Sequence, residues 1–500
     1  MDILQQCQNW HENDEFQKII DVLEAIPSAE RSPEMDSELA RAYNNLADHN
    51  EPEGREMLKK ALELLEAHEE YFADDHCWNF RIGYSYFYLD QEGRALPHFQ
   101  KALAALPDDE DTKWLIDQCK SLISLPRFRE SFRKRTEKAW NAFIQQEAQI
   151  RQIIDSDKNH ERGQEVVNIV NEILDLAFAD IAFEIGFNGQ KYELILTPEG
   201  SKVRRFELVY FRAQAPSEIM EHWNILIGRQ AIEHTGLRRD DGLEVSSEDV
   251  QVWVEKLDED FVSLFVYCEK LLPLLEKEEG KVWWMLSTLT DQTLGELAHM
   301  RYVDSFEVLS TPKAEPAMTM EQLPDELRKQ GFSVPANVED YLDTYMGYTC
   351  KPVEDPDADW RLDVIAGNTR CTPLINGYLS ADNEVMDDLH DDGAVAGFIA
   401  YPLETLKEAD SSDKIFAFRD QLEEAFSTPE AAKLLTLTGE ASGIYCEYVD
   451  FIAWDLRESL TLAQQFFDNS DIPWAIFHTF RREAGTVGLK DSEEEKLEDS

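Results

Sequence analysis

The 500-residue sequence has no apolar run that reaches the roughly 18 residues expected of a membrane-spanning helix. Its opening, MDILQQCQNWHEND, is polar and acidic, whereas a secretory signal begins with basic residues followed by apolar ones. We therefore expect neither a membrane span nor a secretory signal. The expected protein is cytoplasmic and has no membrane partner.

Closely spaced cysteines are also missing. The seven cysteines are odd in number, scattered along the chain and free of any CxxC spacing. A disulfide-stapled secreted domain or a structural zinc site needs cysteines in paired, close spacing. We expect reduced thiols that pack as small apolar side chains, which agrees with a cytoplasmic location.

Basic residues are scarce. Lys and Arg number 48 against 101 Asp and Glu, which gives a formal net charge of −53 at pH 7. A field of this sign repels phosphate backbones, so we expect no nucleic-acid partner. A basic protein, in contrast, is attracted. Solubility alone is the alternative explanation of the charge.

Motifs for catalysis and cofactor binding are absent. The sequence contains no GxxxxGK[ST] loop, no GxGxxG between a strand and a helix, and no HExxH. Four aspartates imitate the start of a calcium-binding loop: Asp355, Asp357, Asp359 and Asp363. However, Trp360 stands where the loop requires Gly, and Ala366 stands where it requires a bidentate Glu. We expect no catalytic residue, metal or cofactor.

The residues that are present suffice for packed cores, since 43% are hydrophobic and 11% aromatic. A chain of this length exceeds one core, so about two to four domains are expected. Residues 1–125 carry apolar residues at helical spacing in successive short stretches. This part is expected to be all helical.

The stretch 78–107, WNFRIGYSYFYLDQEGRALPHFQKALAALP, predicts two short helices packed as a hairpin. Gly83 and Ala95 are small where the helices approach closely, while Tyr86 and Phe99 fill the space between them. This alternation resembles that of a tetratricopeptide repeat. One position departs from the repeat, because the opening Trp of the pattern would fall one residue after Trp78.

The resemblance implies about three stacked hairpins over residues 1–125, which is near the minimum for a continuous core. It also implies that a protein or peptide binds the inner face formed by the first helix of each hairpin. The inner-face positions of this sequence, and hence the expected partner-binding residues, are Arg41, Asn44, Arg81 and Tyr88.

A long amphipathic helix is expected from Arg127 to Asp155. It begins with the basic sequence RFRESFRKR in an otherwise acidic chain. This cluster either grips an acidic peptide or lies against the acidic surface of the protein itself, and the sequence leaves both readings open.

Beyond this helix, apolar residues recur at every second position, a spacing that is typical of strands. IAFEIGFN and QKYELILT flank Asn188-Gly189, a favoured pair for a tight hairpin turn. A third strand is expected over 203–211. A further hairpin is expected over 250–256 and 261–268.

The sequence VYCE at 266–269 returns as IYCE at 444–447, each time at the end of a hairpin and before an aromatic-bearing helix and strand. This echo indicates α+β domains with antiparallel sheets, either duplicated or alike by chance. The expected divisions are a helical-repeat domain 1–125, a long helix with a first α+β domain 126–312, a second α+β domain 313–490, and an acidic tail 491–500.

The layout resembles that of uncharacterised bacterial tetratricopeptide-repeat proteins, which implies a non-catalytic scaffold that binds a protein or peptide. Two alternatives stay open. The first is an acidic inhibitor or immunity-type protein that neutralises a basic partner. The second is an enzyme whose site lies in the α+β region, with candidate residues Glu269, His299, Glu447 and His478.

Overall fold

The structure is a computed structural model that describes residues 3–157, 161–239, 242–275, 277–342, 344–403 and 411–491. The chain divides into two compact units. The first joins residues 1–134 with 347–500, and the second is 135–346. The sequence placed the divisions at 126 and 313 instead. Nearly all of the acidic tail, 491–500, lies outside the described residues.

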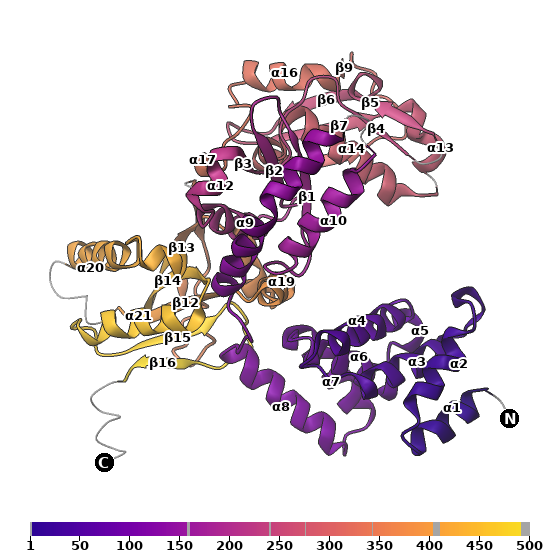
Figure 1. The fold of residues 1–500 in the computed structure, drawn as a ribbon. Helices are drawn as coiled ribbons and strands as arrows, with labels where there is room; N and C mark the ends of the chain where they lie inside the picture. Colours follow the sequence, from indigo (N-terminus) through magenta and orange to yellow (C-terminus); the bar gives the residue numbers. More distant parts are fainter. Residues whose placement is uncertain are drawn as a thin grey trace. The chain divides into compact units, whose positions relative to one another are not determined.

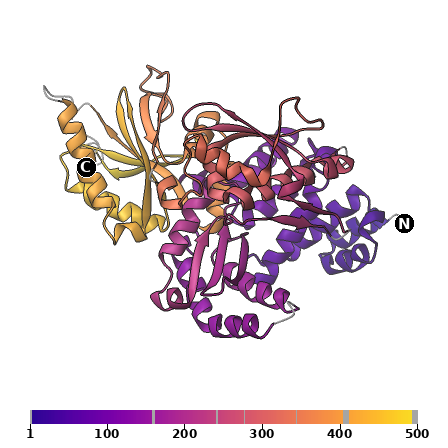
Figure 2. The same ribbon diagram turned by 90° about the horizontal axis from the view of Figure 1, so that it is seen from above.

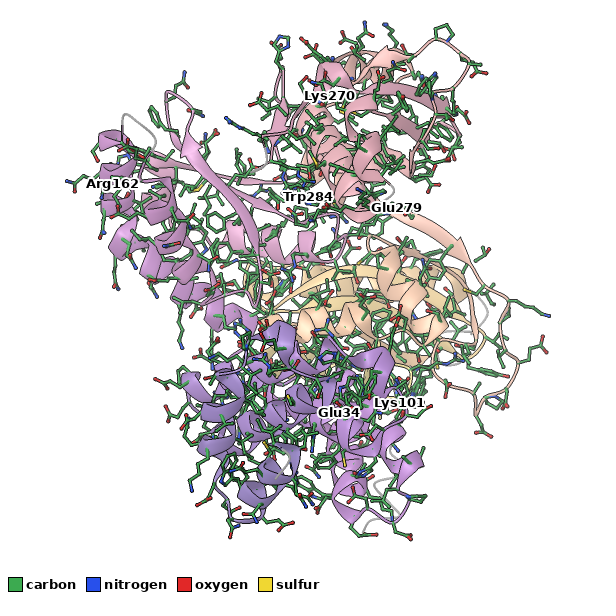
Figure 3. The ribbon with its side chains drawn as sticks, turned by 90° about the vertical axis from the view of Figure 1, so that its right-hand side faces the viewer. Glu34, Lys101, Arg162, Lys270, Glu279 and Trp284 are labelled. Atoms are coloured by element: carbon green, nitrogen blue, oxygen red, sulfur yellow. The ribbon has the colours of Figure 1, made fainter. Side chains whose placement is uncertain are left out.

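The N-terminal part of the first unit is helical, as expected (Figure 1). Its helices are α1 (Ile3–Glu12), α2 (Phe16–Glu24), α3 (Pro33–Leu46), α4 (Pro52–Glu66), α5 (Glu69–Phe72), α6 (His76–Tyr88), α7 (Glu92–Ala105) and α8 (Glu110–Ser124). The side chains of Ser32, Asp75 and Asp109 cap α3, α6 and α8 by accepting backbone N–H groups. Glu34 on α3 and Lys101 on α7 mark this region in Figure 3.

These helices pack as consecutive pairs: α1 against α2, α3 against α4, and α6 against α7. The first members of the pairs also touch, because α3 contacts both α1 and α6. At Gly83 an added Cβ would lie 2.9 Å from the ring of Phe99, so α6 and α7 approach as closely as the sequence predicted. Trp78 is buried, and its indole Nε1 donates to the carbonyl of Leu65 at 3.3 Å.

The C-terminal part of the first unit is a seven-stranded sheet in the order β10-β11-β13-β14-β12-β15-β16. The strands are β10 (Met346–Thr349), β11 (Val364–Thr369), β12 (Val395–Pro402), β13 (Leu435–Gly443), β14 (Cys446–Ala453), β15 (Ala475–Thr479) and β16 (Val487–Lys490). The pairs β11–β13, β13–β14, β14–β12, β12–β15 and β15–β16 are antiparallel.

Helices cover both faces of this sheet (Figure 2). They are α18 (Thr372–Ser380), α19 (Glu384–Asp392), α20 (Ser411–Phe426) and α21 (Leu456–Asp468). Phe398 of β12 packs against Tyr378 of α18, with ring centroids 5.6 Å apart. Tyr401, on the opposite face of β12, packs against Phe418 of α20 and Phe467 of α21. All eight residues of β12 are therefore buried.

The helical part and the sheet of the first unit are joined by ion pairs. On α7, Arg94 Nη2 lies 3.0 Å from Asp388 Oδ1, and Nη1 lies 3.4 Å from Asp391 Oδ2. Arg94 Nε lies 3.8 Å from Asp387 Oδ2, and within the sheet part the buried Arg481 holds the same aspartate, with Nη2 2.5 Å from Oδ1. Because α19 supplies all three aspartates, α7 and α19 form the centre of this junction.

The helix α9 (Phe132–Ser156) begins in the first unit and continues into the second. The expectation of a helix from Arg127 was wrong for its first five residues. The amide of Phe132 donates to the carbonyl of Gly393 at 3.0 Å, and that of Arg133 donates to Trp454 at 2.9 Å. These bonds fix the start of the helix against the sheet region and leave residues 127–131 non-helical.

The second unit contains two small mixed sheets and a two-stranded ribbon. Its strands are β1 (Ala182–Phe187), β2 (Tyr192–Thr197), β3 (Trp223–Ile227), β4 (Gly236–Arg238), β5 (Glu244–Ser246), β6 (Gln251–Lys256), β7 (Val262–Tyr267), β8 (Val303–Val308) and β9 (Met318–Thr319). The sheets run β1-β2-β3 and β8-β7-β6-β9, and β4 pairs with β5. The hairpins β1–β2 and β6–β7 confirm the two predicted from the sequence.

The helices of the second unit include the rest of α9. The others are α10 (Gly163–Leu174), α11 (Arg204–Ala213), α12 (Ser217–His222), α13 (Leu272–Leu275), α14 (Glu279–Leu294), α15 (Glu296–Tyr302), α16 (Leu323–Lys329) and α17 (Val338–Leu342). In Figure 3, Glu279 and Trp284 mark α14, and Arg162 immediately precedes α10. Among the described residues, no helix combines the length and the apolar content needed to cross a membrane.

One expectation for this unit was wrong. Residues 203–211 are not a strand, since α11 occupies Arg204–Ala213. Most residues of α11 are buried, so the helix lacks the polar face that would have separated it from a strand. The unit has the expected antiparallel pairs, and in addition β3 runs parallel to β2 and β8 runs parallel to β7. A helical crossover between hairpin and third strand produces this direction.

The two regions around the similar sequences VYCE (266–269) and IYCE (444–447) have the same order of elements but differ in sheet topology. In the second unit the order is β6, β7, α14, β8, and β8 pairs directly with β7. In the first unit it is β13, β14, α21, β15, with β12 lying between β14 and β15. The order hairpin, helix, parallel strand recurs more closely within the second unit, in β1, β2, α11 and β3.

Candidate functional site

A cavity of about 260 Å³ opens on the helical part of the first unit. Three helices line it: α1, α3 and α6, which are the first members of the three helix pairs. The lining residues are His11, Arg41, Asn44, Asn45, His76, Cys77, Phe80, Arg81 and Tyr84. Residues three and four apart share a helix face, which explains why α3 supplies 41, 44 and 45 while α6 supplies 77, 80, 81 and 84.

Two arginines on this cavity share one carboxylate. Arg81 Nη2 lies 2.6 Å from Glu38 Oε1, and Arg81 Nη1 donates to the hydroxyl of Ser37 at 2.6 Å. Arg41 Nη1 lies 3.4 Å from the other oxygen, Glu38 Oε2. Arg41 is thus held by one long contact, whereas Arg81 is held by two short ones. The pair of cations is only half neutralised by Glu38.

The electrostatics of the cavity reflect this excess of positive charge. Burial lowers the pKa of the Arg41 guanidinium, and the nearby charge of Arg81 lowers it further. Burial also lowers the pKa of His11, with Arg41 the next contributor. The Nδ1 atom of His11 is shielded from solvent and has no hydrogen-bond partner among the described residues. No carboxylate is among the described lining residues, so an entering acceptor competes only with Glu38 for the two arginines.

Asn44 ties the two central helices together. Its Nδ2 donates to the carbonyl of Arg81 at 2.9 Å, and its Oδ1 accepts from the hydroxyl of Ser85 at 2.8 Å. The residue is buried, so these bonds satisfy polar atoms that would otherwise be costly. Asn44 therefore positions Arg81 on the cavity wall.

The rim of the cavity on α6 is aromatic and carries a histidine. His76 Nε2 lies 3.2 Å from Asp109 Oδ2, which orients the imidazole. The exposed Cys77 places Sγ 3.9 Å from His76 Nδ1. Phe80 and Tyr84 follow along the same face of the helix, with ring centroids 6.4 Å apart.

Three of the four residues expected to bind a partner, Arg41, Asn44 and Arg81, line this cavity. The fourth, Tyr88, lies one turn beyond Tyr84 on α6, and the two ring centroids are 4.5 Å apart. Sequence reasoning missed the other lining residues. Helical spacing would have found those on α6, because 77 and 84 share a face with 81.

The candidate residues of the enzyme alternative are divided between the two units. Glu269 and His299 belong to the second unit, whereas Glu447 and His478 belong to the first. Glu269 is exposed, and His299 Nδ1 lies 2.6 Å from Asp291 Oδ1.

The other two candidates are occupied by structural contacts. Glu447 forms an ion pair with Arg419. The two ring nitrogens of the buried His478 lie 2.7 and 2.9 Å from the carbonyl oxygens of Thr479 and Ala484. These contacts explain the burial of both groups.

Asp363, the last of the aspartates that imitate a calcium loop, is bonded within the fold. Asp363 Oδ2 accepts the amides of Tyr445 and Cys446 at 3.0 and 3.2 Å, and Oδ1 accepts the hydroxyl of Tyr448 at 2.5 Å. Asp363 thereby closes the β13–β14 hairpin.

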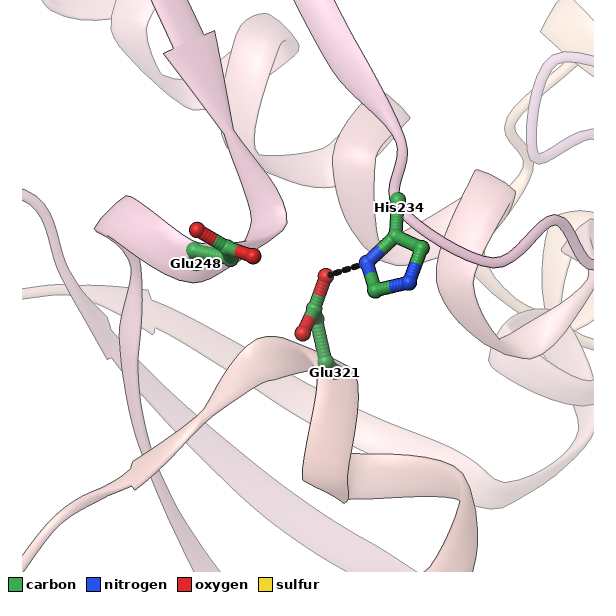
Figure 4. Close-up of side chains that lie close together, drawn as sticks. All are labelled: His234, Glu248 and Glu321. Carbon is green, nitrogen blue, oxygen red and sulfur yellow. Dashed lines mark hydrogen bonds and ion pairs between the residues drawn. The ribbon is translucent and has the colours of Figure 1, made fainter.

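A group of possible metal ligands that sequence reasoning missed lies in the second unit (Figure 4). Ligand atoms of His234, Glu248 and Glu321 all lie within 4.8 Å of one another. Imidazole and carboxylate groups suit a divalent cation. However, His234 Nδ1 already lies 2.7 Å from Glu321 Oε1, which raises the pKa of His234, and Ser247 donates to the same oxygen at 3.2 Å. These bonds account for the arrangement, and we assign no ion.

No protein-family model matches this chain, and neither does any curated protein or solved structure. The proposal of a function therefore rests on the geometry of the cavity of α1, α3 and α6.

Proposed function

We propose that this protein is a non-catalytic scaffold that holds a segment of another protein in the cavity of α1, α3 and α6. The observation that supports this function is the convergence of three successive helix pairs on one cavity, which brings Arg41, Asn44 and Arg81 together. The resemblance of 78–107 to a tetratricopeptide repeat supports the same function, because such repeats bind peptides on the corresponding face.

The chemistry of the cavity favours a segment that presents a carboxylate or another strong acceptor. Arg41 is charged, partly buried and held by a single contact of 3.4 Å, so an incoming carboxylate gains a charge-assisted hydrogen bond. The rings of Phe80 and Tyr84 offer apolar surface beside it. The bound segment therefore pairs an acidic group with an aromatic or aliphatic side chain.

The test uses an array of synthetic peptides screened against the full chain, followed by fluorescence anisotropy with the strongest binders. Replacing Arg41 (Arg41→Met) is expected to weaken binding about tenfold or more, because a charge-assisted hydrogen bond contributes about 1.5–3 kcal/mol. Arg81→Met is expected to act in the same direction, and its thermal unfolding shows whether the loss of its bond to Ser37 disturbs the fold.

The matched control is Arg162→Met, which removes an exposed arginine of the second unit that pairs with Glu165. This variant is expected to bind the selected peptides as the unchanged chain does. If the selected peptides bind Arg41→Met and Arg81→Met with undiminished affinity, the cavity is not their site and the proposed function is wrong.

A second function is favoured by the net charge of −53. In this case the protein neutralises a basic partner, and charge attraction accelerates their association. Binding would then weaken steeply as salt increases and would be indifferent to Arg41→Met. The two functions are separated by measuring both responses with the same partner.

A further inference from the structure

We infer that the first unit carries a second docking surface, a groove that receives an acidic, amphipathic segment of a partner protein. The groove has a volume of about 440 Å³ and lies between the non-helical residues 125–131, the start of α9 and the start of α21. None of its lining residues lines the cavity of α1, α3 and α6. The inference is therefore independent of the proposed function.

Four cationic side chains line the groove: Arg127, Arg129, Lys134 and Arg457. All four are exposed. One carboxylate, Asp455, also lines it, but this group accepts the hydroxyl of Ser131 at 3.1 Å and caps α21. In a chain with 101 acidic and 48 basic residues, a lining with four cations and one engaged carboxylate is a local reversal of charge.

Three of these cations have no counterion in the part of the chain that the structure describes. Among the described residues, the side chains of Arg127, Lys134 and Arg457 form no hydrogen bond or ion pair. Other arginines of the same unit, such as Arg94 and Arg481, pair with carboxylates. The sequence left open whether the basic segment lies against acidic residues of the protein itself. The side chains of Arg127, Lys134 and Arg457 form no ion pair with acidic residues in the part of the chain that the structure describes.

The groove is preformed, because hydrogen bonds within the protein hold both ends of the segment 125–131. Arg129, the fourth cation, donates to the carbonyl of His49 and, at 3.2 Å, to Asn50 Oδ1, which fixes the segment 125–131 to the loop after α3. The backbone bonds of Phe132 and Arg133 fix its other end. A preformed groove loses little conformational entropy when a segment binds.

Apolar side chains form the floor between the cations. Leu125, Phe128, Leu456 and Leu460 all line the groove. Leu456 is buried, and the Phe128 ring packs on the buried His390 with centroids 5.6 Å apart. A segment that fits places apolar residues on this floor and its carboxylates against the three unpaired cations. A protein segment with alternating acidic and apolar residues has this chemistry. A nucleic acid is disfavoured by the charge of the whole chain.

The test begins with a synthetic library of peptides of about ten residues that contain Glu, Asp, Leu and Phe at varied positions. Peptides selected on the full chain are measured by fluorescence anisotropy in about 0.15 M salt, where local charges act over about 8 Å. We expect the triple variant Arg127→Gln, Lys134→Gln and Arg457→Gln to weaken binding about tenfold or more, because it removes the unpaired cations. Within the described ranges these side chains form no hydrogen bond or ion pair, so the fold is expected to remain intact.

The control triple variant is Lys59→Gln, Lys101→Gln and Lys433→Gln. It changes the net charge equally and removes exposed cations of the same unit that lie outside the groove. It is expected to leave the peptide affinity unchanged. Arg41→Met is expected to leave it unchanged as well, so failure here and failure of the proposed function give different results.

Four outcomes would overturn the inference. The first is a library that yields no binder, and the second is a control triple variant that weakens binding as much as the groove variant. The third is a single-stranded RNA of about ten nucleotides that binds the groove more tightly than any selected peptide. The fourth is a chain shortened to residue 491 that binds the peptides about tenfold more tightly, which would make the acidic tail of this chain the occupant.

Discussion

The absence of a side chain at Gly93 allows α7 to pack closely against Arg481 and Asp387. It is the second residue of α7, and an added Cβ would lie 1.9 Å from Arg481 Nη1 and 2.0 Å from Asp387 Oδ1. Both neighbours are buried and bonded to each other, so neither can move without breaking their ion pair. The position is therefore closed to any residue with a Cβ.

Gly93→Ala is expected to destabilise the first unit by about 2–3 kcal/mol, the usual cost of forcing atoms into a packed site. Gly280→Ala is its matched control, since Gly280 is the second residue of α14 and an added Cβ meets nothing within 4 Å. Helix propensity alone makes this control about 0.5–1 kcal/mol more stable. Urea unfolding of both variants measures the difference, and equal shifts would contradict the close contact at Gly93.

Single residues were predictable where a helical period placed them. The inner-face positions Arg41, Asn44 and Arg81 follow from the spacing of the helices, and the structure brings them to one cavity. The same spacing gives no information on bonding partners. Asn44 uses its amide to hold the carbonyl of Arg81, a contact across 37 residues that no local pattern encodes.

At the scale of elements, the junction of α7 and α19 buries ionisable groups. Burial raises the pKa of Glu92 from 4.5 to about 7, with the charges of Asp90 and Asp387 adding to the rise and that of Arg481 opposing it. Burial likewise raises the pKa of Asp391 to about 7. The folded state therefore holds these protons more tightly than the unfolded chain does.

The contribution of Glu92 to the free energy of unfolding is therefore complete below pH 4.5, and it is lost as the pH rises through 7. Glu92→Gln makes position 92 neutral at every pH, while the other ionisable groups of the junction are unchanged. Relative to this variant, the unchanged chain is expected to lose about 2–3 kcal/mol between pH 5 and pH 8. His390, whose pKa burial lowers, titrates with the opposite sign but is common to both proteins.

Urea midpoints of the two proteins at several pH values measure this difference. Glu56→Gln, at an exposed position of α4, serves as the control and is expected to show the same difference from the unchanged chain at both ends of the range. A constant offset between Glu92→Gln and the unchanged chain would show that Glu92 ionises as freely in the fold as outside it.

Elements were predictable when turn residues and periodicity agreed. The hairpin β1–β2 turns at Gly189-Gln190, one residue later than expected, because Asn188 is bonded to Lys191. Gly189 has φ +92°, a conformation that favours glycine. α11 was missed because most of its residues are buried on more than one side, so no continuous polar face reveals the helical period. The start of α9 was misplaced because long-range bonds, rather than local propensity, end the preceding segment at Phe132.

At the scale of the whole molecule, the net charge of −53 acts against the groove that attracts acidic peptides. At about 0.01 M salt the Debye length is about 30 Å, so a peptide feels the acidic surface of the entire protein. At about 0.15 M it falls to about 8 Å, and the cations of the groove dominate. Higher salt then screens these as well.

The affinity of a groove-binding acidic peptide is therefore expected to pass through a maximum between about 0.05 and 0.3 M salt. Anisotropy titrations across this range test the expectation. An affinity that falls steadily from the lowest salt upward would mean that the distant carboxylates exert no force on the peptide. The groove variant described above provides the baseline, because it retains the repulsion without the local attraction.

The division into units could not be predicted from the sequence. Composition and punctuation favoured consecutive domains, whereas the structure combines residues 1–134 with 347–500. The contacts that decide this, such as Arg94 with Asp388, involve surface-type residues with no distinctive local pattern.

This arrangement sets an order of events during synthesis. Arg94 and Asp388 are 294 residues apart, so at about 5–20 residues per second the helices leave the ribosome roughly 15–60 s before their counterpart. For that time the face of α7 with Glu92 and Arg94 stays uncovered, and Glu92 is solvated and ionised. Closing the junction then favours the uptake of a proton by Glu92, because burial raises the pKa of this carboxyl to about 7. Completion of the newly made chain is therefore favoured in mildly acidic surroundings.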